Sequence, residues 1–193
     1  LTTDSPVTFL TVNQKNWYNM YSINGDGGFQ PTLTGTDPLK QLQLTNGVNG
    51  GSTNCTFGGQ PVLECDSFTF SFQLYCVNNS SGDRLILYFG LGAYQVQFAF
   101  EIYAYAGIRL STSSVANAVV SATNWYNSTW NDIRIVYNRR ATNTWTLFFN
   151  ETQIIQYSDP NWSYSNLSGS QWGFTTYNGN SRFTSYIRQL EMT

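Results

Sequence analysis

The sequence contains no histidine, few charged residues and no long apolar run. The lack of histidine excludes Ser-His-Asp and Cys-His catalysis and removes the commonest ligand of transition metals. Charged residues make up 10% of the 193 residues, against the usual ~25%. Net charge is −2 and no basic cluster exceeds Arg139–Arg140, so we expect no nucleic-acid partner. No apolar segment approaches the ~20 residues of a membrane span, so we expect no membrane insertion.

Aromatic residues are abundant, at 17% of the chain, and most of the polarity comes from Asn, Ser, Thr, Gln and Tyr. This aromatic content supplies ample surface to bury, which argues against disorder. No linker, charge run or low-complexity boundary divides the sequence, so we expect residues 1–193 to form a single domain. Leu1 begins directly in polar, strand-like sequence, as in a mature product or a piece of a larger parent polypeptide.

Alternation of apolar and polar residues predicts β-strands from end to end, whereas helical periodicity is absent. In residues 67–76, Phe68, Phe70, Phe72 and Leu74 alternate with polar residues. Similar patterns predict strands at 84–89, 94–103, 107–111, 132–137, 144–149, 152–157, 170–177 and 182–192. The last of these changes phase, which predicts a β-bulge near Arg188–Gln189. The pattern is typical of an all-β, two-sheet antiparallel β-sandwich.

Several of these segments resemble the concanavalin A-like lectin/glucanase superfamily, which includes legume lectins and laminin G-like modules. The resemblance is carried by a Trp-x-x-Ile-x-Ile-x-Tyr strand from Trp130 and a Thr-Trp-x-Leu strand from Thr144. It continues in the Trp-Gly-Phe segment from Trp172, the closing strand from Tyr186, and the central strand that begins at Asp83. It implies a jelly roll and, as an expectation, a glycan or polysaccharide ligand.

The chain departs from the metal-binding and catalytic patterns of that superfamily. The dense Asp/Asn/Glu/His cluster that holds calcium and manganese in legume lectins is missing, so we expect no metal and no cofactor. Calcium could bind loop carboxylates such as Asp26 or Asp37, although no motif supports it. The glycosidase pattern Glu-x-Asp-x-x-Glu is matched only by Glu64 and Asp66, and the lyase pattern Gln-Val-His is replaced by Gln95-Val-Gln97.

We therefore expect no catalytic residue, while leaving an enzyme as an alternative. Glu64 and Asp66 would lie on one face of a strand, about 7 Å apart, within the separation that two carboxylates need for glycoside hydrolysis. Their ordinary interpretation is a solvated loop edge. Glu101, with Tyr103, is the next candidate, and its ordinary interpretation is an exposed strand residue.

Aromatic residues in turn-like sequence are the stronger indication of a site, because sugar rings stack on Trp and Tyr. The predicted ligand-binding residues are Trp125, Tyr126, Trp162, Tyr164, Tyr177 and Arg182, with Gln95 and Gln97 adding polar contacts from a concave sheet face. Packing over the end of the sandwich is the alternative role for each ring. Trp130, Trp145 and Trp172 fit strand positions and are expected in the core.

Cysteines and sequons favour an oxidising, extracellular setting. Cys55, in a Gly/Asn-rich loop, and Cys65, at the start of the next strand, could close that loop with a disulfide, although all three cysteines could instead be free. Cys76 is expected to be a buried free thiol. Sequons at Asn54, Asn79, Asn127, Asn150, Asn161 and Asn166, and an overlapping one at Asn78, predict N-glycosylation, although a chain so rich in Asn, Ser and Thr contains several by chance.

Three functions fit these features. The first is a lectin-like glycan-binding or attachment module, secreted or on a virion or cell surface. The second is a glycoside hydrolase or lyase on the same fold. The third is a structural spike or assembly domain whose exposed rings are buried at a subunit contact, so that an oligomer is possible.

Overall fold

The computed structural model describes thirteen segments of the chain, and the strand over residues 67–77 shows how its layers form. The described residues are 20–25, 32–35, 41–45, 52–57, 67–77, 84–89, 96–101, 107–111, 119–121, 128–141, 143–158, 172–177 and 184–192. In β5 (Ser67–Val77), buried and partly exposed residues alternate without interruption. Because strand side chains point to opposite faces in turn, one face of β5 is apolar and must pack against a second layer.

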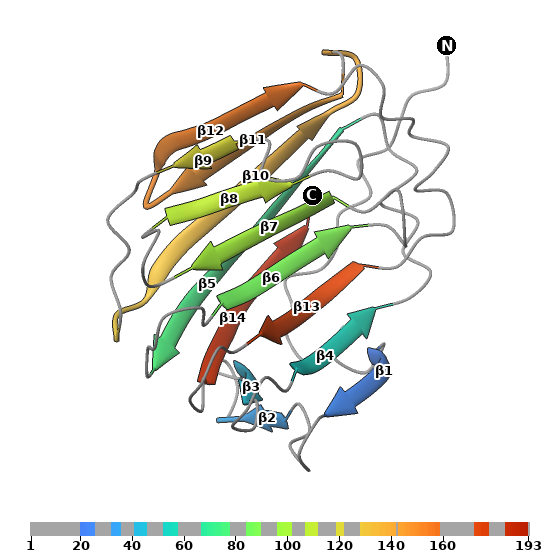
Figure 1. Cartoon of the computed structure of the whole chain (residues 1–193), viewed down its shortest axis with the longest axis vertical. Coiled ribbons are helices and arrows are strands. Elements are labelled where there is room, and N and C mark those ends of the chain that lie inside the picture. The colour runs from blue at the N-terminus through green and yellow to red at the C-terminus, as the bar shows by residue number, and fades with distance from the viewer. Residues whose placement is uncertain are drawn as a thin grey trace.

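Fourteen strands form two seven-stranded sheets within the described residues, and all described pairings are antiparallel. We call the sheet nearer the viewer in Figure 1 the front sheet. Its spatial order is β1 (Met20–Gly25), β4 (Ser52–Phe57), β13 (Trp172–Tyr177), β6 (Arg84–Phe89), β7 (Val96–Glu101), β8 (Gly107–Ser111) and β9 (Val119–Ser121).

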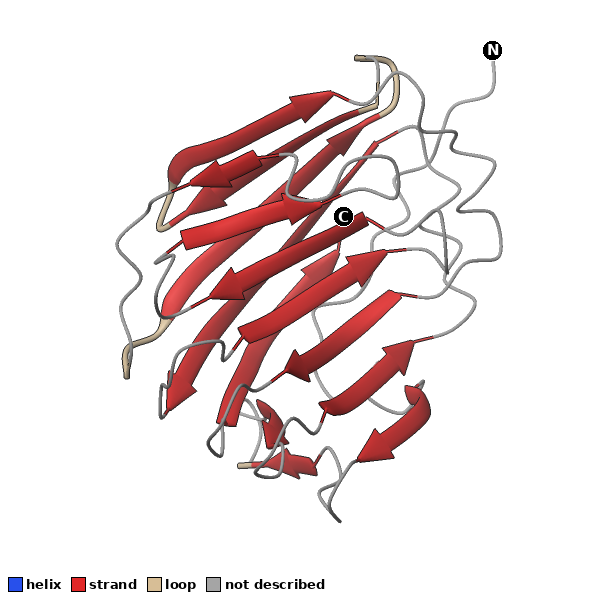
Figure 2. Ribbon diagram, viewed as in Figure 1, coloured by secondary structure: helices blue, strands red, loops and turns tan. Residues whose placement is uncertain are grey.

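The back sheet lies behind the front sheet in the same view (Figure 1). Its spatial order is β12 (Thr152–Ser158), β11 (Thr144–Phe149), β10 (Asn131–Asn138), β5, β14 (Thr184–Met192), β3 (Gln41–Thr45) and β2 (Thr32–Thr34). Sequence neighbours often lie in different sheets or several strands apart, as expected of a jelly roll. The described chain contains no helix (Figure 2), and hence no apolar helix of membrane-spanning length.

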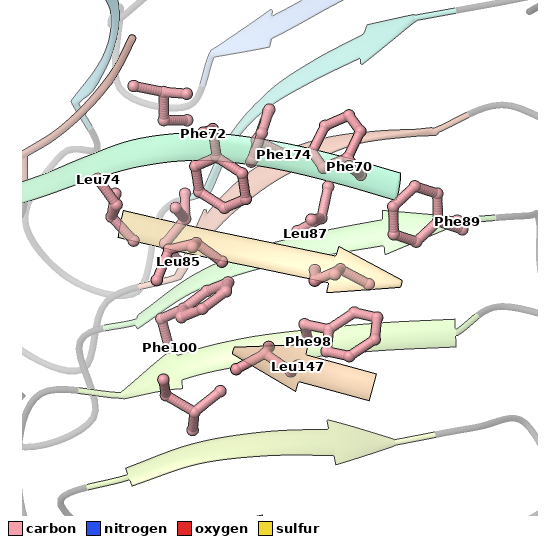
Figure 3. Close-up of a cluster of buried hydrophobic side chains, with 14 of the residues drawn as sticks. Phe70, Phe72, Leu74, Leu85, Leu87, Phe89, Phe98, Phe100, Leu147 and Phe174 are labelled. Atoms are coloured by element: carbon pink, nitrogen blue, oxygen red, sulfur yellow. The ribbon is translucent and has the colours of Figure 1, made fainter. Parts of the chain in front are cut away.

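The core lies between the two sheets and is dominated by aromatic rings (Figure 3). Phe70 of β5 contacts Phe89 of β6 and Trp172 of β13, with ring centroids 5.6 and 5.1 Å apart. Phe72 contacts Phe174 in the same way, at 5.4 Å. These mostly edge-to-face contacts join β5 of the back sheet to the front sheet, and such ring pairs stabilise beyond their buried area.

Most strand predictions for the second half of the chain are confirmed. The strands at 107–111 and 144–149 have the predicted bounds. The predicted bulge in the last strand is confirmed by a register shift between Arg188 and Glu191, where Gln189 adopts a φ of 52°. Trp145 and Trp172 are buried, as predicted.

Two predictions are wrong. Cys55, expected in a Gly/Asn-rich loop, instead lies in β4, a strand paired on both sides. Trp130, expected in the core, is half-buried and lies one residue before β10 begins. Ile133, Ile135 and Tyr137 are buried, so the alternation of β10 directs the even-numbered residues outward. Trp130 continues this outward phase and contacts Tyr75 on the outward face of the back sheet.

Candidate functional site

The front sheet carries the predicted ligand-binding residues that fall within the described chain. Gln97 lies in β7, and Tyr177 is the last residue of β13, where only its backbone is described. The register joins them through the intervening strand β6, because β6 pairs with β13 on one side and with β7 on the other. The outward positions of these strands therefore form one face, which we call the front face. It also carries the apolar residues Ile86 and Ala99, which are register partners.

Gln97 lies at the centre of a row of outward side chains on the front face. Its neighbours Val96 and Phe98 are fully buried, so strand alternation directs Gln97 away from the core. Tyr88 of β6 and Ser111 of β8 are its register partners, and such paired Cα atoms lie ~4.5–5.5 Å apart. Gln97 and Ser111 are half-buried and Tyr88 is 9% exposed. The row therefore combines amide, phenol and hydroxyl groups in a partly shielded setting.

Two arginines lie on the same side of this row, on the two strands that pair with β7. Arg84 of β6 and Arg109 of β8 are both half-buried, and the Nε atoms of both are shielded from solvent. Burial lowers the pKa of Arg109, and the positive charge of Arg84 lowers it further. Glu101 is the register partner of Arg84. Two positively charged side chains thus lie on the front face, on the two strands that pair with β7.

Arg84 and Arg109 are not among the residues predicted for the site, although the sequence carries a signal for their outward direction. Both occupy polar positions in strands whose alternate residues are fully buried. Arg134 and Arg188 occupy outward strand positions of the back sheet in the same way, so this signal indicates the direction of the side chain and does not single out one face.

Most of the other predicted site residues lie outside the described residues. This applies to Gln95, Trp125, Tyr126, Trp162, Tyr164 and Arg182, and to the alternative catalytic pair Glu64 and Asp66. The backbone of Glu101 is described at the end of β7. The convergence of the predicted ligand-binding residues on one ligand remains a prediction. The described part of the chain contains no group of three or more potential metal-ligating side chains, and Asp26 and Asp37 lie outside it.

Of the three cysteines, Cys76 is described in full. It is completely buried in β5 and free, as predicted, and desolvation raises the pKa of its thiol well above the usual range. The backbone of Cys55 lies in β4, where it pairs with Phe174 of β13. Cys65 lies outside the described residues, so the Cys55–Cys65 disulfide remains a prediction.

Two predicted glycosylation sites have described backbones. Asn54 lies within β4, between β1 and β13. Asn150 is an exposed turn residue whose Oδ1 accepts a hydrogen bond from the Asp132 backbone N–H at 2.8 Å and whose Nδ2 donates to Asn131 Oδ1 at 3.3 Å. Glycosylation there remains a prediction, as it does at Asn79, Asn127, Asn161 and Asn166, which lie outside the described residues.

Comparison with known proteins gives matches at the level of structure. No family model and no curated protein sequence matches the chain. Lectin II from Ulex europaeus is 16% identical, with a TM-score of 0.67 over 96% of this chain and 95% of the lectin. The lectin UEA-II, complexed with galactose, is 15% identical, with a TM-score of 0.66 over 96% and 95%.

The carbohydrate recognition domain of Emp46p, in its metal-free form, is a further structural neighbour. It is 12% identical to this chain and has a TM-score of 0.64 over 97% of this chain and 94% of that domain. At these identities the likeness concerns the fold, which each neighbour shares along nearly its whole length. The nature of a ligand must be argued from the residues of this chain.

Proposed function

We propose that this protein, a β-sandwich of the concanavalin A-like lectin fold, is a non-catalytic carbohydrate-binding module in which residues 1–193 form one domain. The observation that carries the proposal is the near-complete match, in both directions, to lectins and a carbohydrate recognition domain. A fold alone does not fix a function, and the front face adds chemistry that suits sugars. The amide of Gln97 and the hydroxyl of Ser111 are hydrogen-bonding groups of the kind that bind ligand hydroxyls.

The loop aromatics complete the proposed site. Trp125 and Trp162 supply ring faces for the C–H faces of a pyranose, while Gln97 and the arginines of the front face bind its hydroxyls. The few charged residues of the chain suit a ligand recognised by hydrogen bonds and stacking. The module acts in attachment or adhesion outside the cell or on a virion or cell surface, where the predicted disulfide and glycans would form.

A glycan array probed with the purified chain tests the proposal. We expect retention of at least one saccharide class, with signal reduced about tenfold or more in Gln97→Leu, Trp125→Ala and Trp162→Ala, which corresponds to the loss of one good contact. Val136→Ala is the control, because Val136 is a half-buried residue of the back sheet. A folded wild-type chain that retains no saccharide would refute the function. Release of reducing ends from a retained polysaccharide would refute its non-catalytic nature.

A further inference from the structure

A second group of aromatic and polar side chains lies on the outward face of the back sheet. Tyr75 of β5 and Tyr186 of β14 are register partners, and their ring centroids are 6.0 Å apart. Trp130 lies on the other side of Tyr75, with its centroid 5.4 Å away. All three rings are half-buried. Tyr75 lies between the fully buried residues Leu74 and Cys76, so this ring group, which we call the back-face strip, faces away from the core.

The position of Trp130 is fixed by contacts from both sides. The backbone N–H of Ser128 donates to the carbonyl of Cys76 at 3.0 Å, which joins the segment before β10 to the end of β5. The side chain of Asn131 donates to the carbonyl of Thr129 at 3.1 Å. Arg188 lies over the face of Trp130, with Cζ 3.8 Å from the ring centroid. The strip is thus held in place without a ligand, which lowers the entropy cost of binding one.

A chain of hydrogen bonds runs beside the strip. Arg188 Nε donates to Gln73 Oε1 at 2.8 Å, and Gln73 Nε2 donates to Asp132 Oδ1, also at 2.8 Å. Gln73 uses both ends of its amide in this way, so its position is fixed. The guanidinium group of Arg188 has further donor positions, and the carboxylate of Asp132 has further acceptor positions. Arg188 and Asp132 carry opposite charges, so the group is neutral as a whole.

The surroundings of the strip are polar and carry charges of both signs, because Arg134 and Glu191 are the register partners of Ser71 in the next row. The outward residues of β5 on the side away from Trp130 are Ser67, Thr69 and Ser71. Gln43 of β3 pairs with Tyr186 at the other edge, and beyond it the hydroxyls of Thr45 and Thr184 are 3.1 Å apart. The core of a protein–protein interface is usually more apolar than this. Rings set among hydroxyl and amide groups favour a polyhydroxylated ligand.

We propose that the outward face of the back sheet is a second saccharide-binding surface, on which a neutral pyranose stacks on Tyr75 and Tyr186 and hydrogen-bonds to Arg188 and Asp132. The proposal rests on the proposed function for its class of ligand but concerns a different surface. Stacking on the tyrosines leaves Trp130 as a positioning residue, because Arg188 covers its ring face. The two sites lie on opposite outward faces of the sandwich, so one chain binds two sugar residues that face away from each other.

Affinity electrophoresis through gels that contain neutral homopolysaccharides (glucan, mannan and galactan), with light scattering to measure self-association, tests the proposal. We expect Tyr75→Ala and Tyr186→Ala to weaken retention about tenfold, and Tyr75→Phe, which keeps the ring, to change it less than about threefold. Phe148→Ala is the matched control. Phe148 is also a half-buried ring of the back sheet covered by an arginine, with Arg134 Cζ 3.7 Å from its centroid, but it lacks the Gln73 network.

The outcomes separate this proposal from the proposed function. Retention that is lost in Gln97→Leu but unchanged in Tyr75→Ala and Tyr186→Ala overturns the second site and leaves the function standing. Equal losses in Tyr75→Ala and Phe148→Ala, with thermal unfolding unchanged, overturn the specific role of the strip. A folded wild-type chain that binds none of these polysaccharides, and whose self-association is abolished by Tyr75→Ala, identifies the face as an interface between two copies. Loss in Tyr75→Ala with Phe148→Ala unaffected supports the proposal.

Discussion

Trp145→Ala should destabilise the sandwich more than any substitution on its surface. Trp145 is fully buried in β11 of the back sheet. Its ring lies 4.5 Å from Tyr137 and 5.8 Å from Phe68 within the same sheet, and 5.5 Å from Phe89 and 5.7 Å from Phe98 of the front sheet. Alanine would remove four ring contacts and leave a cavity at the point where the two layers meet.

The size of the effect follows from measured truncations of buried aromatics. A Trp→Ala change in a core costs ~3–5 kcal/mol, a large part of the ~5–15 kcal/mol that stabilises a typical domain. For a chain of this length each 1 kcal/mol lowers Tm by about 2–4 °C, so Tm should fall by about 6–20 °C. Urea unfolding followed by circular dichroism measures the free energy directly.

The control for Trp145→Ala is its neighbour on the same strand. Thr146 is half-buried on the outward side of β11, so Thr146→Ala should change stability by about 0.5 kcal/mol or less. A loss below about 1 kcal/mol in Trp145→Ala, or an equal loss in Thr146→Ala, would refute the two-layer packing.

Three further predictions concern stability. Asn143 has a φ of 52°, and its Oδ1 accepts a hydrogen bond from the Tyr137 hydroxyl at 3.0 Å. Asn143→Ala should therefore lower the free energy of unfolding, measured in urea, by about 2 kcal/mol. Asn143→Gly should lower it by about half as much, because glycine tolerates this φ. Glu151 has a φ of 63° in the β11–β12 turn and forms an exposed ion pair with Arg134. Glu151→Gly should raise Tm slightly, because glycine suits this φ and the exposed ion pair contributes little. Glu151→Ala should not raise Tm, and differential scanning calorimetry measures both values. Burial raises the pKa of the Cys76 thiol in the folded state. Its contribution to stability is therefore present below the usual thiol pKa and is lost above about pH 9, as the thiol of the unfolded chain ionises. The free energy of unfolding of the wild type, measured in urea, should fall above that pH relative to that of Cys76→Ala.

The sequence predicts the strands of the second half well because their alternation is regular and their turns are short. In β11 and β12 the two-residue turn Asn150-Glu151 leaves a clear boundary, and both of its residues have positive φ as type I′ hairpins require. β4 was missed because its sequence, STNCTF, has one large apolar residue among small polar ones. What makes it a strand is its pairing with β1 and β13, which are distant in sequence.

The candidate sites divide in the same way. Gln97 is predictable because its neighbours on both sides are apolar, so that its outward direction follows from local sequence. The back-face strip is not, because Tyr75, Trp130 and Tyr186 come from three separate segments. Alternation predicts that Tyr75 faces outward. However, the three rings come together only through the pairing of β5 with β14 and the contact of Trp130, just before β10, with Tyr75.

The bulge in β14 shows how one strand supplies both the core and the back face. Ile187 is fully buried and Leu190 is 3% exposed, although they are three positions apart and strict alternation would place them on opposite faces. The positive φ of Gln189, at the register shift, adds the extra residue that returns Leu190 to the core. Without it, either Leu190 would face solvent or Arg188 would turn away from Trp130 and Gln73. The strained residue thus lets the core and the Arg188 contacts exist together, because a slip of one residue exchanges the two faces of a strand.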